Sequence, residues 1–373
     1  MRERYDVVVV GVGGMGSAAL YHLARRGQRV LGLERFDIPH EHGSSHGLTR
    51  IIRLAYFEDP SYVPLVRRSY ELWRELEEET GERLLYTTGI LEAGERIYEG
   101  ALRSCREHDL PHEELDGREV GMRFPAFRLP DDLEVLFQPD GGFVLPERCV
   151  VAHAQGALAR GATIRARERV LGWEETPSGV RVETDRGVAE ADQLVLAAGA
   201  WSQDVARLPP GLVVAQRQVL AWLQPSRPEL FAPDRFPVFN LKFEQGHFYG
   251  FPVFGIPGVK LGRYYHLEER GDPDSLPRDA TPRDETMLRW FAERYLSDAS
   301  GPTIALKTCL FELSPDEHFL IDRHPEAGRA VVAAGFSGHG FKFCSVVGEI
   351  LADVVVEGAT HHDIGMFRLD RFG

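Results

Sequence analysis

A glycine-rich turn near the N-terminus constrains the fold of this chain more than any other feature. A buried strand is expected over residues 7–10, a helix over 17–26 and a second strand over 29–33, which ends at Glu34. The turn between the first strand and the helix carries four glycines, Gly11, Gly13, Gly14 and Gly16. Such glycines let the backbone approach a pyrophosphate at the helix N-terminus, and an acid at the end of the second strand accepts from ribose hydroxyls. We therefore predict a dinucleotide-binding βαβ unit.

The chain has 373 residues, which exceeds the usual size of one hydrophobic core. Further buried strands are expected at 194–198 and 331–334, so distant segments return to the nucleotide-binding sheet. We predict an α/β fold, in which a Rossmann-type domain is interrupted by an α+β substrate domain with a mixed or antiparallel sheet. The first domain is assigned residues 1–85, 150–213 and 320–373, and the second is assigned residues 86–149 and 214–319.

The formal net charge of −14 argues against nucleic acid and anionic membranes as partners. No apolar window is long enough to span a bilayer, and the run at 7–10 is too short for a signal peptide. The four cysteines show neither CxxC spacing nor a disulfide framework, which favours the reducing cytoplasm. No metal is expected, because the histidines and carboxylates lack ligand spacing such as HExxH.

Lysine is scarce in this sequence. The basic residues are nearly all arginine, and the only lysines are Lys242, Lys260, Lys307 and Lys342. An ammonium is a compact charge whose pKa can be tuned, whereas a guanidinium is not. Each lysine is therefore a better functional candidate than usual, although a chance remainder is the simpler alternative.

Several segments together resemble the monomeric sarcosine oxidase branch of the D-amino-acid-oxidase-like flavoproteins. The most specific are Lys-Thr-Cys at 307–309 and Gly-Phe-Ser-Gly-His-Gly-Phe-Lys at 335–342. The others are the N-terminal glycine turn and the segments at 43–53, 196–202, 248–252 and 314–319. They occur in family order, so the resemblance covers nearly the whole chain.

The resemblance implies FAD, attached covalently through a thioether from Cys309 to the flavin 8α-methyl group. A thiolate is the suitable nucleophile, and Arg50 and His46 are candidates to favour it. The alternative is that Cys309 is a small buried apolar residue. Together, the glycine turn and the resemblance place the cofactor contacts at Gly11, Gly13, Gly14, Gly16, Glu34, Arg35, Ser44, Ser45, Thr49, Arg50, Gly199, Trp201, Cys309, Gly338, Gly340 and Lys342.

The resemblance also assigns the residues that handle the substrate. Arg53 and Lys342 match the pair that binds a substrate carboxylate, a role that suits an arginine fork and a second cation. Lys260 matches a lysine beside the flavin that activates O₂, where a fixed cation stabilises developing superoxide. Tyr249 matches an active-site tyrosine, and His46 and Arg50 complete this catalytic set.

The sequence departs from the family pattern on the substrate side. Tyr264 stands where the family has a histidine, and His266 follows two residues later. Either a bulge turns His266 into the site, or Tyr264 replaces the histidine. Phe311 replaces a tyrosine, and Asn240 replaces a methionine that lines the family's substrate pocket.

We therefore expect a monomeric FAD-dependent oxidase of a small secondary amino acid of the sarcosine type, which forms an imine and reduces O₂ to H₂O₂. Alternatives are an FAD amine dehydrogenase, an oxidase of a cyclic imino acid such as proline or pipecolate or of another secondary amine, and a flavin subunit of a larger complex. A nicotinamide-dependent dehydrogenase would explain only the N-terminal turn.

Overall fold

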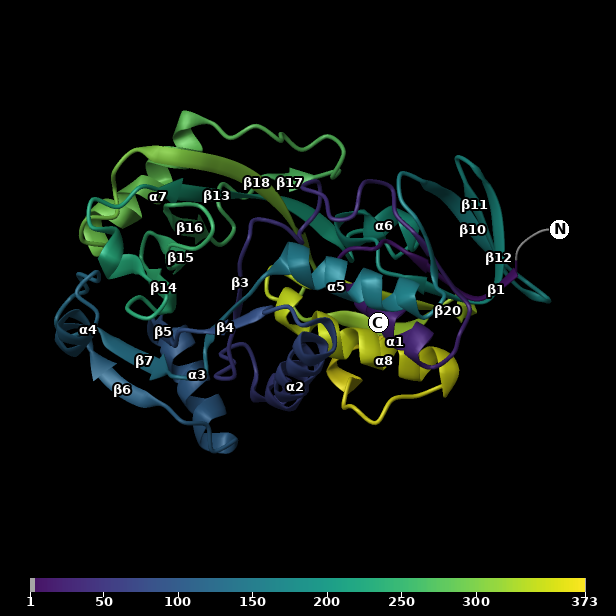
Figure 1. The fold of residues 1–373 in the computed structure, drawn as a ribbon, viewed down its shortest axis with the longest axis horizontal. Coiled ribbons are helices and arrows are strands. Elements are labelled where there is room, and N and C mark those ends of the chain that lie inside the picture. The colour runs from purple at the N-terminus through teal and green to yellow at the C-terminus, as the bar shows by residue number, and fades with distance from the viewer. Residues whose placement is uncertain (1–3, 373) are drawn as a thin grey trace.

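Two large sheets organise the protein. The structure is a computed structural model that describes residues 4–372. The sheets lie toward opposite ends of the long axis, and helices α1, α2, α5 and α8 gather near the middle (Figure 1). No helix within residues 4–372 has the length and apolar character needed to cross a lipid bilayer.

The first sheet is the predicted nucleotide-binding sheet. Its parallel strands are β1 (Arg4–Val10), β2 (Val30–Leu33), β9 (Thr163–Arg165), β12 (Gly187–Leu196) and β20 (Ala327–Ala334). Antiparallel strands extend it, namely β10 (Val170–Thr176), β11 (Gly179–Thr184) and β19 (Leu320–His324). Strands far apart in sequence meet here, as the buried segments after 190 and 330 predicted.

Both faces of this sheet are buried, which explains its runs of valine. Val7 and Val9 of β1 pack into a core shared with the helices, while Val8 and Val10 pack into a second core on the opposite face. The helices of the first core are α1 (Gly14–Arg25), α2 (Val63–Thr80), α5 (Pro146–Ala159) and α8 (Cys344–Val356). Helix α1 contacts both α5 and α8.

The second sheet is mostly antiparallel, with one parallel pair between β5 and β14. Its strands are β5 (Ile90–Ala93), β6 (Glu113–Asp116), β7 (Glu134–Gln138), β13 (Val214–Leu223), β14 (Val238–Phe243), β15 (Gly246–Phe251), β16 (Val259–Arg263), β17 (Arg270–Gly271) and β18 (Thr303–Leu313). Helices α3 (Glu95–Glu107), α4 (Gly117–Arg123) and α7 (Pro282–Tyr295) belong to the same region. The α/β fold with a mixed second sheet is as predicted.

A third, three-stranded sheet lies between these regions. It consists of β3 (Arg50–Ile52), β4 (Leu85–Thr87) and β8 (Gly142–Val144). Strand β8 falls in the predicted substrate domain, and β3 falls in the predicted nucleotide domain. The short helix α6 (Ser202–Val205) follows β12. This sheet therefore joins segments that the sequence assigned to different domains. The domain boundaries inferred from the sequence stay a prediction.

Candidate active site and dinucleotide pocket

A large pocket opens where the glycine turn leaves β1. Its empty volume, which includes the open mouth, is about 1580 Å³. Predicted cofactor residues line this pocket, namely Gly11, Gly13, Gly14, Glu34, Arg35, Ser44, Ser45, Arg50, Gly199, Trp201, Gly338 and Gly340. The other predicted contacts, Gly16, Thr49, Cys309 and Lys342, do not line it.

The N-terminus of α1 has the backbone needed to cradle a pyrophosphate. Gly13 precedes the helix and provides no side-chain cap, and a Cβ there would meet only the Ser45 hydroxyl, 3.8 Å away. A Cβ on Gly14 would lie 2.6 Å from the sulfur of Cys344, so a larger residue here would have to displace that side chain. Gly16 serves packing, because a Cβ there would lie 1.8 Å from the carbonyl oxygen of Gly11. These residues fit a dinucleotide such as FAD.

Glu34 directly follows β2, as predicted, and its hydrogen bonds stabilise the glycine turn. Its carboxylate accepts from the backbone N–H of Val12 at 2.8 Å and of Phe36 at 3.0 Å. A carboxylate offers about four acceptor positions, so capacity for ribose hydroxyls remains. Farther along the wall, Asp274 accepts from Arg35 and from the Trp201 indole N–H at 2.9 Å, which joins two predicted cofactor residues.

Cross-strand register aligns the substrate-side residues on one face of the second sheet. In antiparallel pairs, directly opposed residues share a face. Strand β13 opposes β18 and β16, β16 opposes β15, and β15 opposes β14, which in turn lies parallel to β5. This face therefore carries Cys309, Lys260, Tyr249, Asn240 and Glu92.

Cys309 lies beside the loop that precedes β3. Its sulfur is 3.5 Å from Nη2 of Arg50, which also donates to the carbonyl oxygen of Ser44 at 2.6 Å. The Ser44 hydroxyl donates to the carbonyl of Leu310 at 2.6 Å and so ties this loop to β18. The structure thus joins Cys309, Arg50 and Ser44, three residues that the sequence placed at the flavin.

Lys260 is buried, and its ammonium meets three oxygens. Nζ donates to the carbonyls of Gly47 and Thr49 at 2.7 Å and to the Thr49 hydroxyl at 3.0 Å. Burial lowers the pKa of Lys260 well below its usual value, and nearby Arg50 acts in the same direction. Three acceptors match the three donors of an ammonium, however, and Phe251 lies under the charge at 4.3 Å. The geometry therefore favours a charged Lys260.

His46 is buried among these cations. Neither ring nitrogen has a hydrogen-bond partner among the described residues 4–372. Burial lowers the pKa of His46 to about 2, and the positive charges of Arg50 and Lys260 add to this effect. A neutral imidazole supplies no positive charge, so only Arg50 of the two proposed residues can favour a thiolate at Cys309 electrostatically.

Arg53 and Lys342 form a second cationic group. Both oxygens of Glu58 accept from Nη2 of Arg53, at 2.8 and 2.6 Å, and the guanidinium lies 4.2 Å over the ring of Tyr56. The Lys342 ammonium lies 5.2 Å from that ring and donates to the carbonyl of His339 at 2.6 Å. Burial lowers the pKa of Lys342 to about 7, and the charge of Arg53 contributes. A negatively charged group beside Lys342 would favour its charged form.

The structure places His266, which was predicted as a catalytic residue, away from the other predicted site residues. His266 is buried against α7, where its Nε2 lies 2.8 Å from Asp284, which also pairs with Arg217. Gln218 is directly opposite Cys309, so their side chains share one face of the sheet. The neighbouring residue Arg217 points to the opposite face, because side chains alternate along a strand. The cluster of Arg217, Asp284 and His266 therefore lies on the face away from Cys309. Tyr264 instead lies 5.2 Å from the ring of Tyr249. It therefore lies on the face of the sheet that carries Tyr249.

Sequence reasoning missed four residues near these groups, namely the buried Glu92 and Glu312 and the partly buried Glu58 and His247. His247 stacks on Tyr264 at 4.4 Å and contacts Asn240, and burial lowers the pKa of its imidazole to about 3. Glu312 lines the pocket, and burial raises the pKa of its carboxyl to about 8. Glu92 and Glu312 interrupt apolar strands, and such an interruption is a signal for a buried functional acid.

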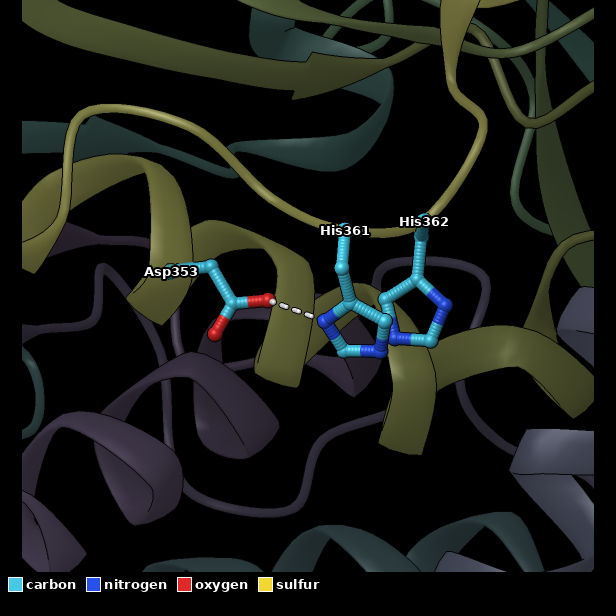
Figure 2. A group of neighbouring side chains, drawn as sticks. All are labelled: Asp353, His361 and His362. Atoms are coloured by element: carbon cyan, nitrogen blue, oxygen red, sulfur yellow. Dashed lines mark ion pairs between the residues drawn. The ribbon is translucent and has the colours of Figure 1, made fainter.

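A separate group of potential metal ligands lies at the end of α8. Figure 2 shows Asp353, His361 and His362 close together, with His361 mostly exposed. Asp353 already pairs with Arg26, and Thr360 donates to its second oxygen at 2.6 Å. Nε2 of His362 contacts Glu349 at 3.1 Å. This arrangement is a hydrogen-bonded ion-pair network, and the expectation that the protein holds no metal stays a prediction.

The sequence matches the family described as "DAO: FAD dependent oxidoreductase" over residues 6–354. It is 42% identical to a protein named monomeric sarcosine oxidase from Streptomyces avermitilis, over 98% of this chain and 97% of that protein. It is 34% identical to N-methyl-L-tryptophan oxidase from Yersinia pestis (strain Pestoides F), over 99% of each chain.

Among solved structures, the fold is similar to the open form of NikD, described as an unusual amino acid oxidase essential for nikkomycin biosynthesis. The TM-score is 0.85 at 30% identity, and the similarity covers 98% of this chain and 97% of that chain. The likeness therefore includes both large sheets.

Proposed function

Because this chain belongs to the DAO family of FAD-dependent oxidoreductases, we propose that it is an oxidase of small secondary amino acids of the sarcosine or N-methyl amino acid type. The observation that carries the proposal is the buried cationic pair of Arg53 and Lys342 next to the sheet face that bears Cys309 and Lys260. Two cations at one end of the site fit a carboxylate, and that contact fixes the position of the neighbouring amine.

The residues of this chain bind and orient, while FAD, when bound, supplies the two-electron oxidation of the C–N bond. Arg53 and Lys342 would hold the carboxylate, and Tyr249 and Tyr264 would line the amine side. The imine product hydrolyses in water to an amine and a carbonyl compound. Burial of the site excludes water from the reacting groups.

We infer further that FAD is attached to Cys309 and that O₂ is the electron acceptor. The 3.5 Å contact between Arg50 and the sulfur favours the thiolate. The thioether replaces one S–H bond and one C–H bond of the flavin 8α-methyl group, and O₂ accepts the two electrons released. The ammonium of Lys260 supplies a fixed positive charge where superoxide develops.

We also propose a monomeric protein in the cytoplasm. All four cysteines are free and buried in the structure, which agrees with a reducing compartment. The monomer is supported by the names of similar proteins alone. Sedimentation of the purified protein measures its oligomeric state directly.

The proposed function is tested by mixing the holoenzyme anaerobically with a panel of amines and following flavin bleaching. The panel contains sarcosine, N-methyl amino acids, L-proline, L-pipecolate and D-amino acids. Air is then admitted, and peroxide is assayed. We expect bleaching by an N-methyl amino acid and prompt formation of peroxide.

The panel also separates the alternatives. Preference for proline or pipecolate would indicate a cyclic imino acid oxidase, which the changes at Asn240 and Phe311 would accommodate. Bleaching without peroxide would indicate a dehydrogenase. If no amine bleaches the flavin, the proposed function is wrong and a missing partner subunit becomes the better explanation.

A further inference from the structure

Glu92 is a buried carboxyl group that has Asn240 and the Arg53 guanidinium beside it, but no hydrogen bond of good geometry. It lies within β5, in register with Asn240 of β14, which in turn opposes Tyr249 of β15. The side chain is fully buried, and among residues 4–372 no donor makes a hydrogen bond of good geometry to either carboxyl oxygen. An unpartnered buried carboxyl costs folding free energy. Its position on the substrate-side face suggests that a ligand satisfies it.

The nearest charge to Glu92 is the guanidinium of Arg53, whose Nε lies 3.4 Å from a Glu92 oxygen. Arg53 is already paired with both oxygens of Glu58. Lys342 is the second cation that acts on Glu92. Two further titratable groups face it, Cys105 of α3 and Tyr264 after β16.

Charge balance decides which form of Glu92 is compatible with a bound substrate. Arg53 and Glu58 neutralise each other, which leaves the single positive charge of Lys342. A substrate carboxylate compensates that charge completely. An ionised Glu92 would then add an uncompensated negative charge in a buried site, which is strongly unfavourable. A protonated Glu92 leaves the site neutral, and its O–H group then requires an acceptor.

We propose that Glu92 is a substrate-binding residue that carries a proton in the complex and donates a hydrogen bond to the substrate carboxylate. The inference rests on the proposed function, because that function places a carboxylate at Arg53 and Lys342. Glu92 lies within reach of this position, since it contacts the same guanidinium. Only a ligand with one carboxylate and an uncharged amine balances the site, so the pocket selects monocarboxylates over dicarboxylates.

The electrostatics of the site agree with a protonated Glu92. Burial raises the pKa of Glu92 to about 7, although the positive charge of Arg53 beside it acts in the opposite direction. Carboxylate binding requires the protonated form, so affinity falls as pH rises through this range. Burial also lowers the pKa of Lys342 to about 7. Lys342 therefore loses its positive charge in the same pH range, and this loss weakens carboxylate binding as well. Only a substitution at Glu92 separates the two contributions.

The test uses the holoenzyme and acetate, a carboxylate without an amine, with acetamide as a neutral ligand of the same shape. Binding is measured from the change in flavin absorbance between pH 6 and pH 9. The variants are Glu92→Gln, which keeps a neutral donor, and Glu92→Leu, which removes it. Unchanged flavin spectra and thermal midpoints show that each variant is folded, and Glu92→Gln decides the test if Glu92→Leu does not fold.

At pH 6 we expect Glu92→Gln to bind acetate as the parent protein does. Glu92→Leu should bind it about tenfold or more weakly, since a hydrogen bond to a charged group is lost. Above pH 7 the affinity of the parent protein should fall more steeply than that of Glu92→Gln, by up to about tenfold per pH unit. Acetamide binding should change little with pH in all three proteins.

Two outcomes would overturn the inference. The first is the same pH dependence in Glu92→Gln and the parent protein, and the second is tighter acetate binding by Glu92→Gln at pH 6, which would mean that Glu92 is ionised and repels the ligand. Acetate binding requires no turnover. Failure of the amine panel with the expected acetate result would therefore reject the proposed function alone, and the reverse result would reject the inference alone.

Discussion

At the scale of single residues, the contact between Cys309 and Arg50 leads to a prediction about how the flavin is attached. We expect that flavin stays with the acid-precipitated parent protein and is released from Cys309→Ala, because only a thioether at this sulfur resists denaturation. The matched control is Cys105→Ala, a buried cysteine on α3 that does not line the dinucleotide pocket. Acid-stable flavin in Cys309→Ala would show that the attachment, if any, lies elsewhere.

A second prediction at this scale concerns the role of Lys260 in the reaction with O₂. Lys260→Met removes the charge held by Gly47 and Thr49 but keeps the length of the side chain. We expect reoxidation of the reduced enzyme by O₂ to slow at least about tenfold, with a smaller effect on anaerobic reduction by substrate, because the charge acts where negative charge develops on oxygen. Stopped-flow absorbance resolves the two steps. Lys242→Met, which removes an exposed lysine, is the control. Equal slowing of both steps would remove Lys260 from this role.

At the scale of secondary-structure elements, the contact between α7 and the second sheet depends on one buried acid. Asp284 pairs with Arg217 at 3.0 and 2.9 Å and accepts from Thr281 at the start of α7. Asp284→Ala leaves Arg217 without its main partner in a buried position, so we expect the free energy of unfolding to fall by about 3 kcal/mol. Urea denaturation measures this loss.

The control for that substitution is Asp116→Ala, which removes a solvent-exposed N-cap of α4 and should cost about 1 kcal/mol. Because the Asp284 cluster lies on the face away from Cys309, the flavin spectrum of Asp284→Ala should stay unchanged. A shifted flavin spectrum would contradict the assignment of His266 and Asp284 to a structural role.

Some of these strands and site residues could be predicted from the sequence alone, and others could not. The glycine turn and the buried runs at 194–198 and 331–334 predicted the nucleotide-binding sheet, because these are local patterns. The flavin role of Cys309 followed only from the family resemblance of the 307–309 segment. The choice between Tyr264 and His266 was open, because the chain leaves β16 after Arg263 and Tyr265 adopts a φ of 55°. Strand alternation no longer applies beyond that point. Glu92 was missed because its role depends on which strands lie beside β5, and those pairings are non-local.

At the scale of the whole molecule, buried neutral histidines couple the stability of the fold to pH. His22 of α1 and His153 of α5 lie in the helical layer, where His153 packs against the rings of Trp73 and Tyr21. Burial lowers the pKa of His22 from 6.5 to about 4, although Glu349 acts in the opposite direction. Burial also lowers the pKa of His153 well below its usual value. Unfolding exposes both rings to water, where they bind protons readily near pH 6.

The stabilisation from His22 is therefore fully present above pH 6.5 and is lost as pH falls toward 4, because the unfolded chain then binds a proton that the folded protein does not. Between pH 7 and pH 5 this one residue should lower the free energy of unfolding by about 2 kcal/mol. In His22→Gln, which cannot titrate, the urea midpoint should depend less on pH. His361→Gln, which changes an exposed histidine of the network in Figure 2, should keep the dependence of the parent protein. An equal pH dependence in His22→Gln and the parent protein would mean that His22 is not held neutral in the fold.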